Sequence, residues 1–298
     1  MNISDKTDQL KDEAISIIVK KCLYGELSID EQLKFGKIYN RIAPRKVYRY
    51  RRANYESGDN YDLIALREDK LWLANPVSFN DPFDCFYRLN IDDLIEGAEQ
   101  LATKNFLISS VSDDFRQLFR DKAIKNSAKL KKLFESQRKY TDSLRVACFS
   151  EDYDNIQMWG YYANAHKGIC VEYDTVQIQG DKRLLLAPVR YVKKYEKVIS
   201  IDGRALEKGI IRSAYTKSSN WKNEKEWRIV ENNDTLNESG NENGSLISFV
   251  KPTAIYLGCM AEKKLIDDVT ELCKERDIAL FQMDIDNKKY KLNPRKIF

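Results

Sequence analysis

The sequence has little histidine and no paired-cysteine motif, and both shortages exclude kinds of metal site. His166 is the single histidine among 298 residues, so a histidine-rich metal site is impossible and a Ser-His-Asp triad would have to use it. The six cysteines contain no CxxC spacing, which argues against a zinc ribbon. The sequence also lacks a GxxxxGKS/T loop, a GxGxxG on a predicted strand, HExxH and GxSxG. The common nucleotide-binding, metalloprotease and hydrolase motifs are therefore not indicated.

Long apolar runs and a strong net charge are missing too. No run approaches the roughly 18 apolar residues of a membrane-spanning helix, and acidic residues precede the short apolar stretch near the N-terminus, unlike in a signal peptide. We therefore expect a cytoplasmic protein with no membrane partner. The 50 Lys and Arg against 46 Asp and Glu leave a charge of +4, too small to indicate nucleic-acid binding over the whole surface. The 43% hydrophobic residues suffice for a folded core.

The pattern of apolar residues divides the chain near Pro44. Helical spacing predicts a helix over 4–24, and Ser28 with Glu31 forms the pattern of a capping box that opens a second helix to about residue 40. We therefore expect residues 1–45 to form an N-terminal helical appendage.

The remainder, residues 46–298, is predicted to be one α+β domain. Residues 91–142 have helical composition and are expected to form a helical insertion. Strand patterns fall at 46–51, 70–74, 144–150, 168–174, 184–192 and 224–230, with more to follow. Because helices come early and strands dominate after 144, the expected sheet is mixed or largely antiparallel.

One segment, 116–145, has a strong charge asymmetry. It contains ten basic and three acidic residues, which leaves a net charge of +7. Two interpretations are open: a solvated helical insert, or a surface that binds nucleic acid or another acidic partner.

The first candidate site is the stretch KSSNWKNEKEWRIV (217–230), which contains two closely spaced glutamates. On a strand that starts near 224, Glu224, Glu226 and Arg228 would lie on one face. One carboxylate could stabilise a developing positive charge while the other orients or deprotonates a nucleophile. The alternative is a surface ladder in which Arg228 neutralises Glu226.

A second candidate is the aromatic face of a helix predicted to run from Asp154 to about His166, with Gly168 as its left-handed stop. Trp159, Tyr162 and His166 share that face and could form the wall of a pocket for a ring, or a stripe facing the core. Ser150 ends the preceding strand, where its hydroxyl could meet a ligand or cap a turn.

A third candidate combines the strand KVYRYR (46–51) with the loop SFNDPFD. Arg49 or Arg51 could bind a phosphate or carboxylate from the strand, with Asn80 and Asp81 in a proline-stiffened loop over the cleft. The alternatives are a structural ion pair for Arg49 and a loop anchored by its phenylalanines.

Several stretches together resemble a bacterial family of unknown function, number 2971 in the series of such domains. They are VYRYR, LWLANPVSFNDPFD, VACFSE, MWGYYANAHKGICVEYD, KSSNWKNEKEWRIV and AIYLGCM, between about residues 46 and 260. That family implies no mechanism.

The order of these stretches also resembles, more distantly, the Arg–Ser–Glu layout of ADP-ribosyltransferases. The resemblance implies a split sheet and NAD as substrate, without a metal. It assigns NAD positioning to Arg49, the serine of the middle strand to Ser150, the catalytic glutamate to Glu226 and the acceptor-side glutamate to Glu224. The other residues implied at the NAD site are Tyr48, Asn80, Trp159, Tyr162, His166 and Trp221.

The expected function is therefore an NAD-dependent ADP-ribosyltransferase-like enzyme, by analogy a toxin or phage-defence effector that modifies a macromolecule. Breaking the nicotinamide–ribose bond passes through a sugar cation that a fixed carboxylate stabilises. Two alternatives are a metal-dependent nuclease and a non-catalytic module that binds nucleic acid or a partner. The nuclease would hold Mg²⁺ with Asp81, Glu172, Glu224 and Glu226.

Overall fold

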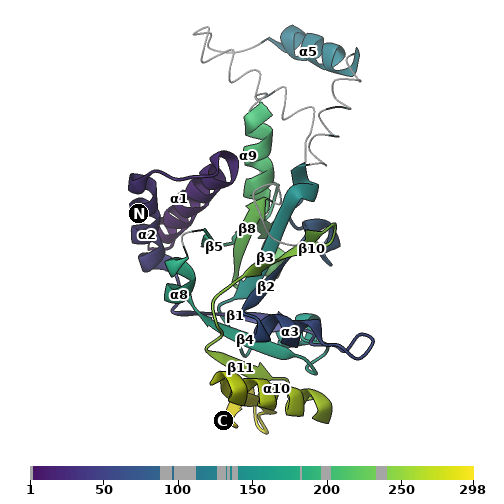
Figure 1. Cartoon of the computed structure of the whole chain (residues 1–298). Coiled ribbons are helices and arrows are strands. Elements are labelled where there is room, and N and C mark those ends of the chain that lie inside the picture. Colours follow the sequence, from purple (N-terminus) through teal and green to yellow (C-terminus); the bar gives the residue numbers. More distant parts are fainter. Residues whose placement is uncertain are drawn as a thin grey trace.

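The computed structural model describes most of the chain (Figure 1). The described residues are 3–87, 112–125, 140–181, 183–195, 203–232 and 240–298, with the single positions 96, 132 and 135. The predicted insertion 91–142 lies largely outside them, as does much of the basic segment 116–145.

Two helices open the described chain, and the others lie between its strands (Figure 1). They are α1 (Ile3–Tyr24), α2 (Ile29–Ile42), α3 (Tyr61–Arg67), α5 (Asp113–Lys125), α7 (Ile156–Tyr162), α8 (Thr175–Gly180), α9 (Gly203–Ser213) and α10 (Lys263–Arg276), with 3₁₀ turns η1 (Pro76–Ser78) and η2 (Ser219–Glu224). The predicted capping box is confirmed: Ser28 and Glu31 satisfy each other's backbone N–H groups at the start of α2. No helix among the described residues has both the length and the apolar character to cross a bilayer.

The strands form one open, mostly antiparallel sheet, so the α+β class with a mixed sheet is confirmed. They are β1 (Lys46–Arg51), β2 (Lys70–Ala74), β3 (Leu144–Ser150), β4 (Ile169–Asp174), β5 (Leu186–Pro188), β8 (Glu226–Asn232), β9 (Gly240–Asn241), β10 (Gly244–Ser248), β11 (Ala254–Leu257), β12 (Ala279–Ile285) and β13 (Leu292–Lys296). Their order is β13-β12-β11-β4-β1-β3-β2-β10-β9, and β8 pairs with β3 and β5. The pair β11–β12 is parallel, and β6 (Arg190–Val192) and β7 (Thr216–Ser218) form a separate parallel pair.

Strand β3 is the junction of the sheet. One of its edges pairs with β8 along the whole strand, from Leu144 to Ser150. It meets β1 at a single register position, Ser150 opposite Tyr48, and β2 at another, Val146 opposite Ala74. Since β1 runs on with β4 and β2 with β10, the two groups of strands diverge from β3. A notch opens in the sheet between them.

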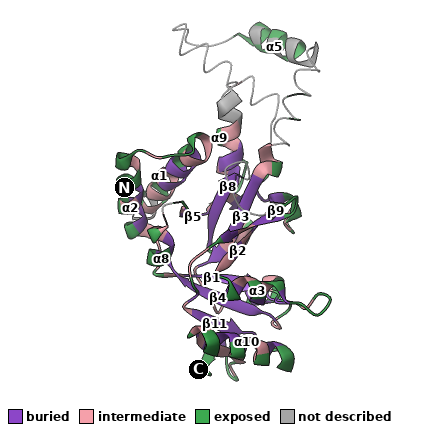
Figure 2. Cartoon of the chain, viewed as in Figure 1, coloured by how far each residue is buried: buried purple, intermediate pink, exposed green. Residues whose placement is uncertain are grey.

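The N-terminal helices pack on the reverse face of β8. The side chains of a strand alternate between its faces, so Trp227 and Glu231 lie opposite to Glu226 and Arg228. Tyr39 of α2 meets Trp227 edge-on with ring centroids 6.1 Å apart, and Lys21 of α1 pairs with Glu231. Buried residues of α1, α2 and the sheet belong to one hydrophobic cluster (Figure 2). Helices α1 and α2 thus complete the core on that side.

Strand β1 separates two hydrophobic clusters, as the alternation of its residues predicts. Val47 lies in the large cluster shared with the N-terminal helices. Tyr48 and Tyr50 lie in a second one with Trp159 of α7 and Tyr256 of β11.

The structure corrects two predictions around α7. Its N-cap is Asn155, whose side chain accepts from the N–H groups of Gln157 and Met158, and the predicted Asp154 lies before it. The helix ends at Tyr162 rather than near His166, and Gly168 is not in a left-handed conformation. Gly168 is required for close packing: a Cβ there would lie 2.2 Å from the carbonyl oxygen of Arg51.

Arg145 also departs from its prediction as part of a basic surface. It belongs to β3, and its side chain is buried. The guanidinium donates to Ser245 Oγ and to the carbonyl oxygens of Asn241, Asp142 and Leu144. Its charge therefore holds strands together and is not presented to a partner.

Gly168→Ala tests the close contact between β4 and the end of β1. The neighbouring atoms are backbone and cannot rotate away, so we expect the free energy of unfolding to fall by about 1–3 kcal/mol. The control is Gly160→Ala inside α7, where a Cβ meets nothing within 4 Å. This control should stabilise the helix slightly, by up to about 1 kcal/mol. Urea unfolding followed by circular dichroism measures both, and equal effects would contradict the packing role of Gly168.

Candidate functional site

A cavity of about 260 Å³ lies at the notch where β1 and β2 diverge from β3. Residues from β1, β2, β3 and α7 line it, together with the loop after η1 and the segment from β7 to β8. Six of the ten predicted site residues are among them: Tyr48, Arg49, Asn80, Tyr162, Glu224 and Glu226. The fold thus brings together four segments that lie far apart in the chain.

A buried lysine, Lys217, organises the acidic side of the cavity. Its ammonium group donates to Glu224 and, at 3.0 Å, to Glu226, and it lies 3.4 Å from Asp84. Its side chain is 5% exposed. Burial works against the lysine's charge, but Glu226, Asp84 and Glu224 outweigh it and raise the pKa of Lys217. Lys217 therefore stays protonated and holds the carboxylates together.

Arg228 donates to both carboxylate oxygens of Glu226. Its Nε and Nη2 donate to the two oxygens of Glu226 at 2.7 and 2.9 Å, and Nη2 also donates to Asp84 at 2.6 Å. Arg228 itself is fully buried. Burial opposes ionisation of Glu226, yet the Arg228 and Lys217 charges prevail and lower its pKa to about 2. The expected neutralisation of Glu226 by Arg228 is thus present, but it is buried and not on the surface.

Glu224 lies in a different environment from Glu226. It ends η2 before β8 begins, and Lys225 between the two carboxylates has a left-handed backbone. One oxygen accepts from the Tyr162 hydroxyl at 2.8 Å and the other from Lys217. Burial raises the pKa of Glu224, Lys217 opposes this, and Glu226 adds to it. Two neighbouring carboxylates with opposite pKa shifts are typical of a pair with divided acid–base roles.

Arg49 is a buried cation without a carboxylate partner among the described residues. It is 7% exposed, its Nη2 donates to the carbonyl oxygen of Trp72, and its guanidinium lies over the Phe149 ring. Its Nη1 has no hydrogen-bond partner among the described residues. Burial and the nearby Arg51 lower the pKa of Arg49 to about 10. Buried charges normally have a counter-ion, so this side of the cavity is suited to an anion.

Ser150 fixes the backbone below the cavity and does not line it. It is fully buried, and it lies opposite Tyr48 on one side and Glu226 on the other in the sheet. Its hydroxyl donates to the carbonyl oxygen of Glu224 at 2.7 Å and accepts from the N–H of Asp152. Ser150 therefore positions Glu224.

Trp159 and His166 lie outside the cavity. Trp159 is fully buried in the second hydrophobic cluster, and its Nε1 donates to the carbonyl oxygen of Tyr153. His166 stacks on the Trp159 ring, and burial lowers its pKa. These two side chains form the core-facing stripe that was the alternative interpretation of the aromatic pattern.

Trp221 borders a neighbouring cavity of about 480 Å³. Lys217 lies over its ring at 5.4 Å from the centroid, and Tyr161 meets it edge-on. Lys217 lines both cavities, so they adjoin at this residue.

Sequence reasoning missed Lys217 and Asp84, the two residues that complete the charge cluster. Both lie in stretches that were quoted for other residues, and neither lies next to a carboxylate in the sequence. The one available signal lay in β8, a strand of buried residues that contains the opposite charges Glu226 and Arg228. Buried charges need partners, and these could come from elsewhere in the chain.

Of the four carboxylates considered for a metal, Glu172 and Asp81 lie away from the pair Glu224 and Glu226. Glu172 on β4 accepts from Tyr256, Thr253 and Lys46 on another part of the sheet. Asp81 caps the turn at Phe83 and lines the neighbouring cavity. Across the described residues, no group of three or more His, Cys, Asp or Glu side chains is arranged to hold a metal ion.

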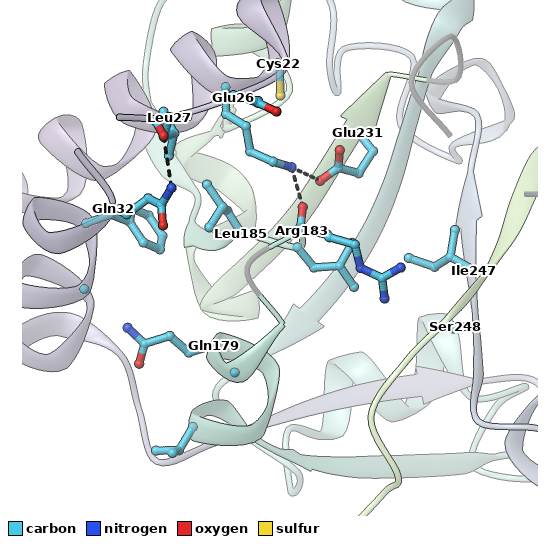
Figure 3. A pocket seen from close by; sticks show the side chains of 17 residues that line it. Cys22, Glu26, Leu27, Gln32, Gln179, Arg183, Leu185, Glu231, Ile247 and Ser248 are labelled. Atoms are coloured by element: carbon cyan, nitrogen blue, oxygen red, sulfur yellow. Dashed lines mark hydrogen bonds and ion pairs between the residues drawn. The ribbon is translucent and has the colours of Figure 1, made fainter. Parts of the chain in front are cut away.

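A larger cavity of about 920 Å³ lies between the N-terminal helices and α8 (Figure 3). Its charged residues largely satisfy one another: Lys21 donates to Glu231 and to the carbonyl oxygen of Arg183. None of the ten predicted site residues lines it. The cavity at the notch therefore remains the candidate site.

Comparison with known proteins gives one family. Residues 158–229 match the model of a family described as "Protein of unknown function (DUF2971)". The match supports the resemblance to that family and covers Tyr162, Lys217 and both site carboxylates. No curated protein and no solved structure gives a significant match.

Glu226→Gln tests the buried charge cluster. The change leaves Arg228 with less compensation, so we expect the free energy of unfolding to fall by about 3–5 kcal/mol at neutral pH. The lowered pKa of Glu226 means that the wild-type protein loses this contribution as the pH falls from about 4.5 to about 2. The variant should lose less stability over that range.

The measurement is urea unfolding at a series of pH values. The control is Glu262→Gln, whose side chain is 77% exposed and should change stability by less than about 1 kcal/mol. Equal stability of the two variants, with the same acid dependence, would show that Glu226 does not neutralise Arg228.

Proposed function

We propose that the protein is an NAD-consuming ADP-ribosyltransferase-like enzyme that modifies a macromolecule. One observation carries the proposal: a buried arginine with no carboxylate partner among the described residues lines the same cavity as two carboxylates with opposite pKa shifts. This combination suits a substrate that is anionic at one end and develops positive charge at the other.

Arg49 would bind the pyrophosphate of NAD. Its Nη1 can donate to a phosphate oxygen, and the incoming charge would compensate the buried cation. Arg51 and Arg52 line the cavity beside it and also an adjoining one of about 370 Å³. The two spaces together give a dinucleotide room to extend along β1.

Glu224 is the carboxylate better placed to meet the ribose. A carboxylate can accept about four hydrogen bonds. Glu226 already accepts two from Arg228 and one from Lys217, whereas Glu224 accepts only from Tyr162 and Lys217 among the described residues. We therefore exchange the roles that the resemblance implies, so that Glu224 contacts the sugar and Glu226 holds Lys217 and Arg228.

The reaction then proceeds by cleavage at the ribose. The bond between ribose C1′ and the nicotinamide nitrogen breaks, and its electron pair leaves with neutral nicotinamide. The Glu224 carboxylate stabilises the cation left on the sugar. An acceptor oxygen or nitrogen forms the new bond to C1′, and its proton passes to a base, for which Glu224 with its raised pKa is suited.

The arrangement of strands also favours this function. Tyr48, Ser150 and Glu226 occupy one row across β1, β3 and β8, and Arg49 lies one position further along β1. A notch at β3 would suit the split sheet that the resemblance implies. A role as a toxin or phage-defence effector belongs to the same proposal by analogy.

Glu224→Gln tests the proposal on the full-length protein. The purified chain is incubated with NAD and a cell extract, and nicotinamide release is followed by chromatography. Loss of the charge-stabilising group should slow release by about 10²–10³-fold. The matched control, Glu271→Gln on α10, has a 67% exposed side chain and should leave the rate unchanged.

Thermal unfolding of both variants checks that the fold is retained. The proposal is lost when the wild-type protein yields neither nicotinamide nor a modified macromolecule.

Arg49→Lys tests the anion site separately. Lysine keeps the charge but cannot reproduce the planar fork of donors, so we expect the KM for NAD to rise about 10- to 100-fold. Arg45→Lys is the control, because that side chain is 72% exposed and pairs with Asp174 outside the cavity. An unchanged KM in Arg49→Lys would place the pyrophosphate elsewhere.

A further inference from the structure

The cavity beside Trp221 has an unusual wall of exposed aromatic rings. Phe83 and Phe86 lie in the loop after η1, and Tyr195 follows β6. Their exposed fractions are 63%, 49% and 41%, although large apolar rings normally gather in the core. Phe86 meets Tyr195 edge-on with ring centroids 6.0 Å apart. A clustered aromatic patch of this kind marks a binding surface more often than a solvated one.

Positive charge accompanies the rings. Lys193 and Lys194 line the same cavity, both are exposed, and neither forms an ion pair with another described residue. Asp81 also lines it, so the rim has two lysines against one acid, while Lys217 is neutralised by its carboxylates. The patch is therefore complementary to a partner that is both flat and negatively charged.

Polar groups complete the wall nearest the candidate site. Ser218 and Asn220 line the cavity, and the Asn220 side chain is exposed with no hydrogen-bond partner among the described residues. An amide presents both donors and an acceptor, which suits the edge of a nucleobase.

We propose that this aromatic cavity binds an unpaired nucleobase of single-stranded nucleic acid, which is the acceptor of the transferred group. Exposed rings with neighbouring lysines are how proteins bind single strands: bases stack on the rings, and the lysines meet the phosphates. A peptide acceptor would make less use of stacked rings. The acceptor role rests on the proposed function, while binding itself does not.

The position of the cavity fits an acceptor. It adjoins the candidate site at Lys217, and Trp221 contacts Tyr161, which lines the other side. A base in the aromatic cavity would therefore lie next to Glu224, the carboxylate proposed to stabilise the ribose cation.

Binding is measured first, on the full-length protein without NAD. Fluorescein-labelled 12-nucleotide strands of DNA and of RNA are compared with a duplex of the same length by fluorescence anisotropy. We expect both kinds of single strand, or one of them, to bind more tightly than the duplex. Phe86→Ala should weaken this binding about tenfold or more, because stacking on an aromatic ring contributes about 1–3 kcal/mol per base. Phe83→Ala serves as a second variant, and Tyr290→Ala, a fully exposed ring after β12, is the matched control.

The salt dependence tests the lysines. Replacing Lys193 and Lys194 by glutamine should reduce the slope of log affinity against log salt by about 1.4, since each phosphate contact on a single strand contributes about 0.7. Lys288 and Lys289, an exposed pair between β12 and β13, give the matched double substitution, which should leave the slope unchanged.

The transfer step is then followed with radiolabelled NAD, the same strands and a soluble protein extract. Label on the single strand, lost in Phe86→Ala, supports the inference. Label on proteins alone overturns it and leaves the proposed function intact. Salt-dependent strand binding without any NAD turnover overturns the acceptor role together with the proposed function. Strand binding that is absent, or equally strong in Phe86→Ala and Tyr290→Ala, overturns the site itself.

Discussion

The site depends on the pairing of Arg228 with Glu226 and Asp84 in the interior of the protein. A guanidinium with no exposed surface would destabilise the fold unless carboxylates accompanied it. Once Arg228 fixes both oxygens of Glu226, Lys217 is held between three carboxylates. This network leaves Glu224 as the acidic group with unused acceptor capacity. The role proposed for Glu224 thus follows from the way in which the buried charge of Arg228 is neutralised.

The second constraint is the divergence of strands around β3. If β3 paired with β1 along its whole length, β3 would lie directly beside the middle of β1 and leave no space next to Arg49. Because β1 and β2 each meet β3 at one register position, the sheet opens between them. Arg49 spans the opening by donating to Trp72 on β2, and its other terminal nitrogen has no hydrogen-bond partner in the part of the chain that the structure describes. The same divergence of strands therefore provides both the cavity and the buried guanidinium that we propose as its anion site.

Local patterns in the sequence predicted the elements well but the connections between them only in part. The capping box at Ser28 and the alternation of β1 depend on neighbouring residues, so they could be read directly. The end of α7 could not, because the left-handed turn at 164–166 follows from the close approach of Gly168 to the end of β1. Arg145 looked like a surface charge, and its burial depends on acceptors from distant strands.

The site shows the same division. Arg49, Glu224 and Glu226 could be chosen as candidates from the sequence, since charged residues are uncommon in predicted strands. Among the described residues Glu226 accepts three hydrogen bonds and Glu224 two, and this difference could not be predicted because Lys217 reaches both from a separate strand. Trp159 had the spacing of a pocket wall, but helical spacing does not tell which face meets the core.

The packing of α1 and α2 against β8 divides that strand by parity. Odd-numbered side chains such as Trp227 and Glu231 face the helices, and even-numbered ones such as Glu226 and Arg228 face the charge cluster. Consecutive residues of β8 are therefore under different constraints. One set must pack against the helices, and the other must balance the buried charges. The kinds of substitution that β8 tolerates should therefore alternate from one residue to the next. In homologues that lack the two helices, we expect the odd-numbered positions of β8 to carry different residues.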